Sequence, residues 1–250
     1  MLPRLGVATF NIHKGLGPFN WRASIHELRE HMRQLDADVV FLQEVAGQHS
    51  GGAARARSMP QESQYEFLAD QVWREFAYGR NAVYPRGHHG NAILSHYPIM
   101  RAENEDVSDY RFERRGLLHC ELLFAGHNLH CVCLHLALTA GSRRRQLQAL
   151  VKRVRKLVPA GAPLVVAGDF NDWRGEANDE LLHELQLHEV FQQHHGAPAR
   201  SFPSAFPLLR LDRIYQRGFR VLAARVGHGK PWSRLSDHAV LTAQLELQGV

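Results

Sequence analysis

The chain has 250 residues, 44% of them hydrophobic, with a formal net charge of +5. This length suits one domain, residues 1–250, and no stretch approaches the roughly 20 apolar residues of a membrane-spanning helix or the apolar segment of a secretory signal. We therefore expect a soluble, cytoplasmic protein whose basic charge favours anionic partners such as nucleic acid, phosphorylated metabolites or an acidic lipid surface.

Hydrophobic periodicity predicts the first elements in chain order. A strand is expected over 5–11. A helix follows, opened by a capping box of Ser24 and Glu27 and carrying one apolar stripe. Residues 38–45 read as a fully buried second strand. From 46 to 61 the composition shifts to small and polar residues, which predicts a long exposed loop.

The middle and end of the chain continue to alternate between strands and helices. A helix is expected over 64–76 and another from Ser142. Strands are expected at 78–84, 91–95, 163–169, 211–215, 219–226 and 238–247, and a hairpin is expected with arms at 117–124 and 129–138. Without an internal repeat, this alternation indicates an α/β or α+β fold.

The helix that begins at Ser142 is strongly basic. Seven basic and no acidic residues fall between Arg143 and Lys156. Such a row is commonly a solvated helix face, although clustered cations also form anion-binding surfaces. Arg143 and Arg144 lie on the apolar side at the helix start, so one of them is expected to reach inward.

Polar residues that can bind a metal or a phosphate follow the apolar part of several strands. Each alone is typical of a turn, a helix cap or a structural histidine. Together they are informative, because unpaired buried carboxylates are costly and a divalent cation at one end of the sheet would satisfy them. An oxygen-rich set without a cysteine motif favours Mg²⁺ or Mn²⁺ over zinc. The residues are Asn11, Glu44, His135, Asp169, Asn171, Asp212, Asp237 and His238.

Seven short motifs occur in the order found in one superfamily. They are TFNIH, LQEV, GNAILS, LHL, GDFN, LDRIY and SDHAVL, and they span residues 9–242. The sequence therefore resembles the endonuclease/exonuclease/phosphatase superfamily of metal-dependent phosphohydrolases, and in particular its short bacterial members. The resemblance implies a DNase I-like, four-layer α/β/β/α sandwich of two mixed sheets, with the active site at one rim and Mg²⁺ or Mn²⁺ as cofactor.

The resemblance also implies a role for each motif residue. Glu44 would be the principal metal ligand, with Asn11 and Asp237 near the metal. Asp169 would orient or deprotonate the attacking water. Asn171 would hold a phosphate oxygen.

Histidines would complete the implied site. His238 would contact the phosphate or act as a base, oriented by Asp212, and His135 would donate a hydrogen bond or a proton to the phosphate or leaving group. Arg115 would add positive charge at the rim, with a surface position as the alternative. For the pair His88-His89 a surface position is the expectation, and a place lining the site is the alternative.

The implied reaction is hydrolysis of a phosphodiester by an activated water, with nucleic acid as the favoured substrate. One alternative is a phospholipid head group or an inositol phosphate, reached at an anionic lipid surface through the basic helix. A second alternative is a catalytically inactive binding protein of the same fold. Asp172 and Trp173 follow GDFN and are expected to mark a subgroup, and with it a substrate, rather than the shared chemistry. The SFPS loop at 201–204 is expected to have a role in substrate access.

Overall fold

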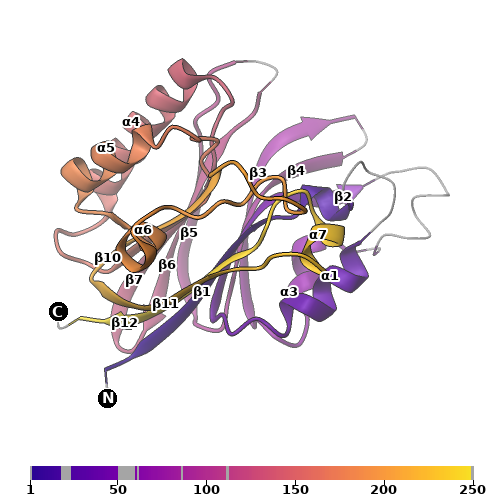
Figure 1. The fold of residues 1–250 in the computed structure, drawn as a ribbon, viewed down its shortest axis with the longest axis horizontal. Coiled ribbons are helices and arrows are strands. Elements are labelled where there is room, and N and C mark those ends of the chain that lie inside the picture. Colours follow the sequence, from indigo (N-terminus) through magenta and orange to yellow (C-terminus); the bar gives the residue numbers. More distant parts are fainter. Residues whose placement is uncertain are drawn as a thin grey trace.

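Two mixed sheets packed face to face form the centre of the molecule (Figure 1). The computed structural model describes residues 2–17, 24–49, 60, 62–85, 87–110 and 113–248. The first sheet has the spatial order β11 (Phe219–Val226), β12 (Leu241–Leu247), β1 (Arg4–Asn11), β2 (Val39–His49), β4 (Gly87–Ser95) and β3 (Glu75–Tyr84). The second has the order β5 (Ile99–Asp106), β6 (Gly116–Phe124), β7 (His127–His135), β8 (Leu164–Asp169), β10 (Asp212–Arg217) and β9 (His188–Glu189).

Helices cover the outer face of each sheet, which completes the predicted four-layer sandwich (Figure 1). The first sheet is covered by α1 (Ile25–Met32), α3 (Gln64–Ala69) and α7 (Trp232–Leu235), and the second by α4 (Ala140–Leu157) and α5 (Glu176–Leu185). The short helix α6 (Val190–His195) adds apolar side chains to the core between the sheets. None of the helices in the described ranges is long and apolar enough to cross a membrane.

Burial on both faces explains why several strands are continuous apolar runs. On β1, Leu5 and Val7 face the second sheet, whereas Ala8 and Phe10 face the helices. On β8, Val165 likewise joins the core between the sheets. These strands can therefore expose polar side chains only where they end, at the rim of the sandwich.

The strand directions bring those ends to one rim. β1 is parallel to β2, and β7 is parallel to β8. The carboxyl ends of β7 and β8 therefore coincide, and β10, which is antiparallel to β8, begins at the same place. This arrangement positions the site described below.

Two sequence predictions near the N-terminal half were wrong in extent. β2 continues to His49, so residues 46–49, expected in the exposed loop, belong to a strand, and residues 50–59 and 61 of that expected loop lie outside the described part. The helix expected over 64–76 ends at Ala69, and β3 begins at Glu75. The Trp73 indole donates to the Ala37 carbonyl (3.0 Å), an interaction with a distant segment that helical periodicity does not show.

The capping box expected at Ser24 and Glu27 does not form. The Ser24 hydroxyl instead donates to the carbonyl of Leu235 (2.9 Å), which ties the start of α1 to α7. A capping box occurs at α3, where the Ser63 amide donates to the Glu66 carboxylate (3.2 Å). The strand β5 and the helices α5 and α6 are additional elements that periodicity did not predict.

Candidate active site

A row of three polar residues crosses neighbouring strands of the second sheet. His135 pairs in register with Asp169, and Asp169 pairs in register with Asp212. Because directly opposed residues on adjacent strands point to the same face, their side chains lie together. The His135 Nε2 atom is 3.4 Å from the Asp169 Oδ2 atom.

His238 completes this row from a segment at the other end of the chain. Its Nδ1 atom lies 2.8 Å from the Asp212 Oδ2 atom, and its Nε2 atom lies 3.8 Å from Asp169. Burial alone would lower the pKa of His238, but the negative charges of Asp212 and Asp169 outweigh burial and raise it to about 10. The ring is therefore a fixed imidazolium at neutral pH.

Asp169 is a buried carboxylate with several hydrogen-bond donors. The Asn11 side-chain amide donates to Oδ2 (3.2 Å), and the Asn171 backbone amide donates to Oδ1 (2.9 Å). Burial raises the pKa of Asp169 above its ordinary value, and the charge of His238 opposes this only in part. Such a carboxylate is suited to accept a proton from water near neutral pH.

The GDFN motif has a local structural reason. Gly168 has φ of +149°, and a Cβ placed there would lie 1.9 Å from the carbonyl oxygen of Leu134. Only glycine allows β8 to approach β7 this closely. Phe170 then packs into the core under α4 and α5, and the Asn171 side-chain amide donates to the Leu136 carbonyl (2.9 Å). The motif thus fixes Asp169 from both sides.

Glu44 lies at an irregularity in β2. The pairing of β2 with β4 shifts register between Leu42 and Val45, and Glu44 has φ of +54°. This conformation is sparsely populated for a residue other than glycine, and such strain concentrates at functional sites. The Glu44 carboxylate is 3.4 Å from the ammonium of Lys14, which follows β1.

The charges of Lys14 and Arg115 act on two histidines of this rim. Burial, with the charge of Lys14, lowers the pKa of His89 to about 4. Burial, with the charge of Arg115, lowers the pKa of His135 well below its ordinary value. Both histidines are therefore neutral at pH 7. Arg115 donates to the Glu113 carboxylate (3.1 Å), and its charge contributes to the lowered pKa of His135.

Asp237 is joined to Asn11 through His13 and Ser236. The His13 ring is 3.0 Å from Asp237 Oδ1, and the His13 amide donates to Asn11 Oδ1 (3.1 Å). The Ser236 hydroxyl donates to the Asn11 carbonyl (2.7 Å). Burial would raise the pKa of Asp237, but the His13 hydrogen bond and the charge of His238 hold it below its ordinary value. Asp237 is therefore ionised.

The donor set fits a divalent cation. Asp169, Asp212 and His238 form a possible metal site, the one group of acidic, histidine or cysteine side chains within the described ranges whose ligand atoms all lie within 4.8 Å, and His238 could bind a metal only after losing its ring proton. The Oδ1 atom of Asp212 is buried without a hydrogen-bond partner in that part of the chain. Without His238, the donors at this rim are oxygen atoms of carboxylates and of the Asn11 amide, the kind that Mg²⁺ and Mn²⁺ prefer.

The structure therefore brings most of the predicted residues together. Direct contacts join six of them, and Asp237 connects through His13, while Glu44 bonds Lys14 and has no described contact with the row. The six are Asn11, His135, Asp169, Asn171, Asp212 and His238, of which Asn171 uses its backbone amide, since its side-chain amide donates to the Leu136 carbonyl.

Sequence reasoning missed several residues of this rim. His13 is the last residue of the TFNIH motif and Lys14 follows it, so their place in the sequence was the available signal. The surface position expected for the pair His88-His89 was wrong, because both are half-buried: His88 bonds the Tyr78 hydroxyl (2.9 Å), and His89 lies within electrostatic reach of Lys14.

Two further predictions concern residues that flank the site, the pair Arg143 and Arg144 and the pair Asp172 and Trp173. Arg143 reaches inward, as expected for one of the pair, and donates to the Leu138 carbonyl (2.7 Å), whereas Arg144 is exposed. Asp172 accepts from the amide of Ala177 (2.8 Å), so it anchors the start of α5. Trp173 is 44% exposed, and its ring centroid is 5.0 Å from the Arg143 guanidinium.

Comparisons with known proteins find matches that span nearly the whole chain. A model of the Endonuclease/Exonuclease/phosphatase family matches residues 8–238. The uncharacterized protein YbhP of Escherichia coli strain K12 is 49% identical over 243 residues, covering 96% of each chain.

Solved structures share the fold. An endonuclease/exonuclease/phosphatase from Beutenbergia cavernae has a TM-score of 0.79 at 21% identity, covering 99% of this chain and 72% of that one. D. rerio TDP2 complexed with a single-strand DNA product has a TM-score of 0.72 at 20% identity, covering 97% of this chain and 99% of that one. At these identities the likeness extends to the DNase I-like fold alone.

Proposed function

As this chain belongs to the endonuclease/exonuclease/phosphatase family, we propose that it is a metal-dependent phosphodiesterase that hydrolyses nucleic acid by attack of an activated water. The observation that carries the proposal is the environment of Asp169. This carboxylate is buried between the rings of His135 and His238 and is oriented by the Asn11 amide.

In this proposal Asp169 accepts the proton of the attacking water. Its raised pKa brings it closer to neutrality, where a general base is effective, and its two hydrogen bonds fix its direction. At neutral pH it is still largely ionised.

The two histidines have different parts because their charges differ. His238, held cationic by Asp212, binds a phosphate oxygen and stabilises the negative charge of the transition state. His135 is neutral, so it donates a hydrogen bond to the phosphate or leaving group rather than serving as a charged acid. Of the two roles expected for His135, donation of a hydrogen bond is therefore favoured over donation of a proton.

Glu44, Asn11 and Asp237 would hold Mg²⁺ or Mn²⁺. When bound, such an ion supplies charge neutralisation at the phosphate and lowers the pKa of a bound water. Two carboxylates supply negative charge for this ion. Asp237 is ionised, and Glu44 has one ion pair within the described residues, with Lys14.

Nucleic acid is the preferred substrate for two reasons. The chain carries a net charge of +5, which favours a polyanion over a small uncharged ester. D. rerio TDP2, which has the same fold, was crystallised with a single-strand DNA product.

A substrate panel tests the proposal. We expect DNA or RNA and an artificial aryl phosphodiester to be hydrolysed with Mg²⁺ or Mn²⁺, and phosphomonoesters, inositol phosphates and phospholipids to be hydrolysed at least tenfold more slowly. Faster hydrolysis of a phospholipid or of an inositol phosphate than of nucleic acid would show that nucleic acid is not the preferred substrate. Unchanged hydrolysis rates in Glu44→Gln would contradict the assignment of Glu44 as a metal ligand. A folded protein inert toward every ester with both ions would be a binding protein of this fold.

A further inference from the structure

The basic helix α4 contains two kinds of cation, which the structure separates. Four of its seven basic residues interact with other side chains of the protein. Arg143 is buried against the Trp173 ring. The other three form ion pairs: Arg145 with Asp109, Arg153 with Glu103 and Glu105, and Arg155 with Glu184. The remaining Arg144, Lys152 and Lys156 are exposed and make no ion pair with any residue in the described ranges.

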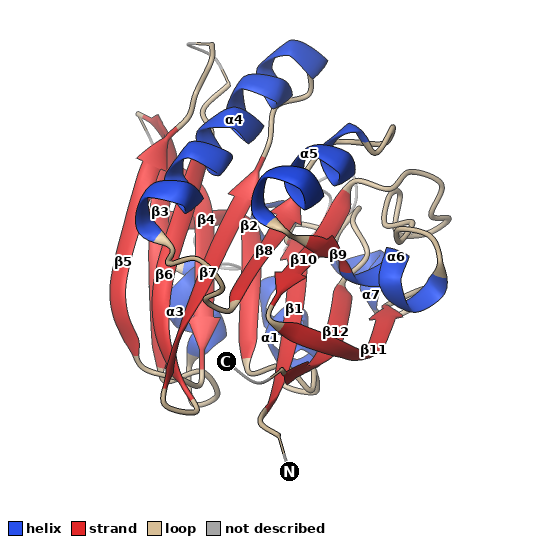
Figure 2. Cartoon of the chain, turned by 90° about the vertical axis from the view of Figure 1, so that its left-hand side faces the viewer, coloured by secondary structure: helices blue, strands red, loops and turns tan. Residues whose placement is uncertain are grey.

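These three free cations line one groove. It has a volume of about 800 Å³ and lies between α4 and α5, which run side by side over the second sheet (Figure 2). From Arg144 to Lys156 the helix rises by about 18 Å. The acids on the opposite wall are Glu180 and Glu184, and Arg155 neutralises the second. The groove therefore keeps an excess of positive charge along its length.

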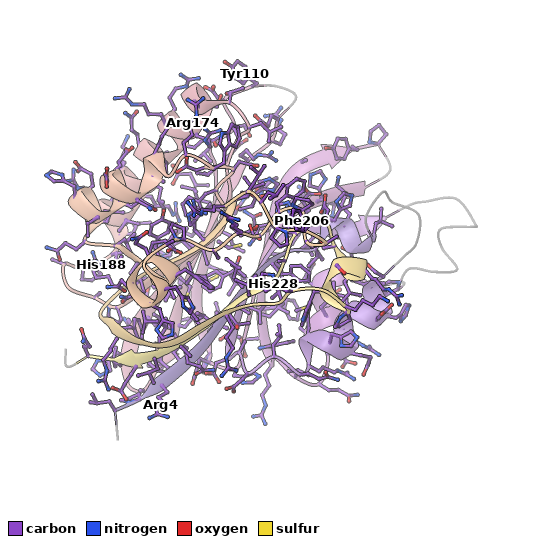
Figure 3. The ribbon with its side chains drawn as sticks, viewed as in Figure 1. Arg4, Tyr110, Arg174, His188, Phe206 and His228 are labelled. Carbon is purple, nitrogen blue, oxygen red and sulfur yellow. The ribbon has the colours of Figure 1, made fainter. Side chains whose placement is uncertain are left out.

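The groove begins at the rim that carries the active site. α4 follows β7, which ends at His135, and α5 follows β8, which ends at Asp169. Since β7 and β8 are parallel, both helices lead back from the same rim. Trp173 is 44% exposed and lies beside the start of α4, where its ring centroid is 5.0 Å from the Arg143 guanidinium. The exposed Arg174 next to it lies in the upper part of Figure 3, on the side of α4 and α5.

We propose that this groove binds the backbone of a single-stranded nucleic acid whose reacting phosphodiester lies in the active site, with a base stacked on Trp173. The inference rests on the proposed function, since it assigns the path of that substrate beyond the reacting bond. A cationic groove with an aromatic side chain is the arrangement by which proteins hold single strands. A lipid surface fits less well, because the surface is concave and Val151 is the one apolar residue among its lining.

Binding measured without hydrolysis tests the groove. Anisotropy of a labelled 20-nucleotide single strand is recorded in EDTA over a range of salt concentrations, for the wild type and for Arg144→Gln/Lys152→Gln/Lys156→Gln. Each phosphate contact contributes about 0.7 to the slope of log affinity against log salt for single strands. We therefore expect the slope to become shallower by about 2 in the groove variant.

A charge-matched control uses Arg101, Arg145 and Arg220, which are exposed, lie outside the groove and pair with acids. Replacing all three with Gln changes the net charge equally and should leave the slope near that of the wild type. Equal slopes for the two variants would overturn the proposal, because net charge alone would then explain binding. So would a groove variant that keeps strand binding but loses binding to vesicles of anionic lipid.

Trp173 gives a second readout. Trp173→Ala should weaken strand binding by about tenfold at every salt concentration, as loss of one stacked base does, and Trp173→Phe should restore most of it. Unchanged binding in Trp173→Ala would contradict the stacking contact. Hydrolysis of a small aryl diester by the wild-type protein tests the proposed function separately, since so small a substrate cannot reach the groove.

Discussion

At the scale of single residues, the site depends on how neighbouring charges set protonation. His135 and His238 both contact Asp169, yet one is neutral and the other cationic. The negative charge of Asp212, whose carboxylate lies 2.8 Å from the His238 Nδ1 atom, is the largest of the contributions that raise the pKa of His238, and Asp169 adds to it. The sequence motifs predicted the members of this group but not their charges, because burial and hydrogen bonding decide the charges.

Replacing Asp212 with Asn tests the origin of the imidazolium. The substitution keeps the shape but removes the charge that outweighs burial, so the pKa of His238 should fall by several units and the ring should be neutral at pH 8. We expect kcat to fall by about a hundredfold or more, with KM less affected. Histidine NMR titration measures the protonation directly. A His238 still cationic at pH 8 in the variant would refute the assigned cause.

At the scale of secondary-structure elements, β1, β8 and β11 were each predicted to within one residue of their observed bounds. The apolar runs of β1 and β8 are typical of strands buried on both faces, whereas the arm expected over 129–138 was too long, because β7 ends at His135. The helix expected over 64–76 was too long, because the segment from Glu75 pairs with β4, and pairing between distant segments overrides local periodicity. The irregularity in β2 at Glu44 was invisible for the same reason.

The strands β6 and β7 also hold a buried histidine pair that supports a pH prediction. His119 Nε2 lies 3.1 Å from His130 Nδ1, and burial, with the charge of Arg153, lowers the pKa of His119 to about 4. The unfolded chain therefore binds more protons between about pH 6.5 and pH 4, so the free energy of unfolding should decrease as pH falls through that window. Glu103 and Arg101 face the same pair.

Substitution of His119 by Gln isolates this contribution. Gln keeps a hydrogen-bonding group and cannot titrate, so the variant should lose less stability than the wild type when the pH is lowered from 6.5 to 4. The difference should be at most about 3 kcal/mol. Urea denaturation at several pH values measures it. Parallel curves for the two proteins would show that His119 does not titrate with folding.

At the scale of the whole molecule, the ordered motifs predicted the four-layer sandwich and the rim where the site lies. The sandwich followed from the superfamily resemblance that the motifs carry. The rim is shared because the parallel strands β7 and β8 end at His135 and Asp169, and the antiparallel β10 begins there at Asp212. The sequence did not reveal the groove between α4 and α5. Which cations of α4 are free depends on acids contributed by distant elements, such as Asp109 and Glu103, and spacing along one helix cannot show that.

The most direct test compares two neighbouring aspartates on one substrate. Asp169 and Asp172 are both buried, but Asp169 lies in the site and Asp172 anchors α5. With Mg²⁺ or Mn²⁺ and an artificial aryl phosphodiester, Asp169→Asn should lower kcat on the order of a thousandfold, whereas Asp172→Asn should stay within about threefold of the wild type. Equal activity of Asp169→Asn and the wild type would contradict the assignment of Asp169 as the base.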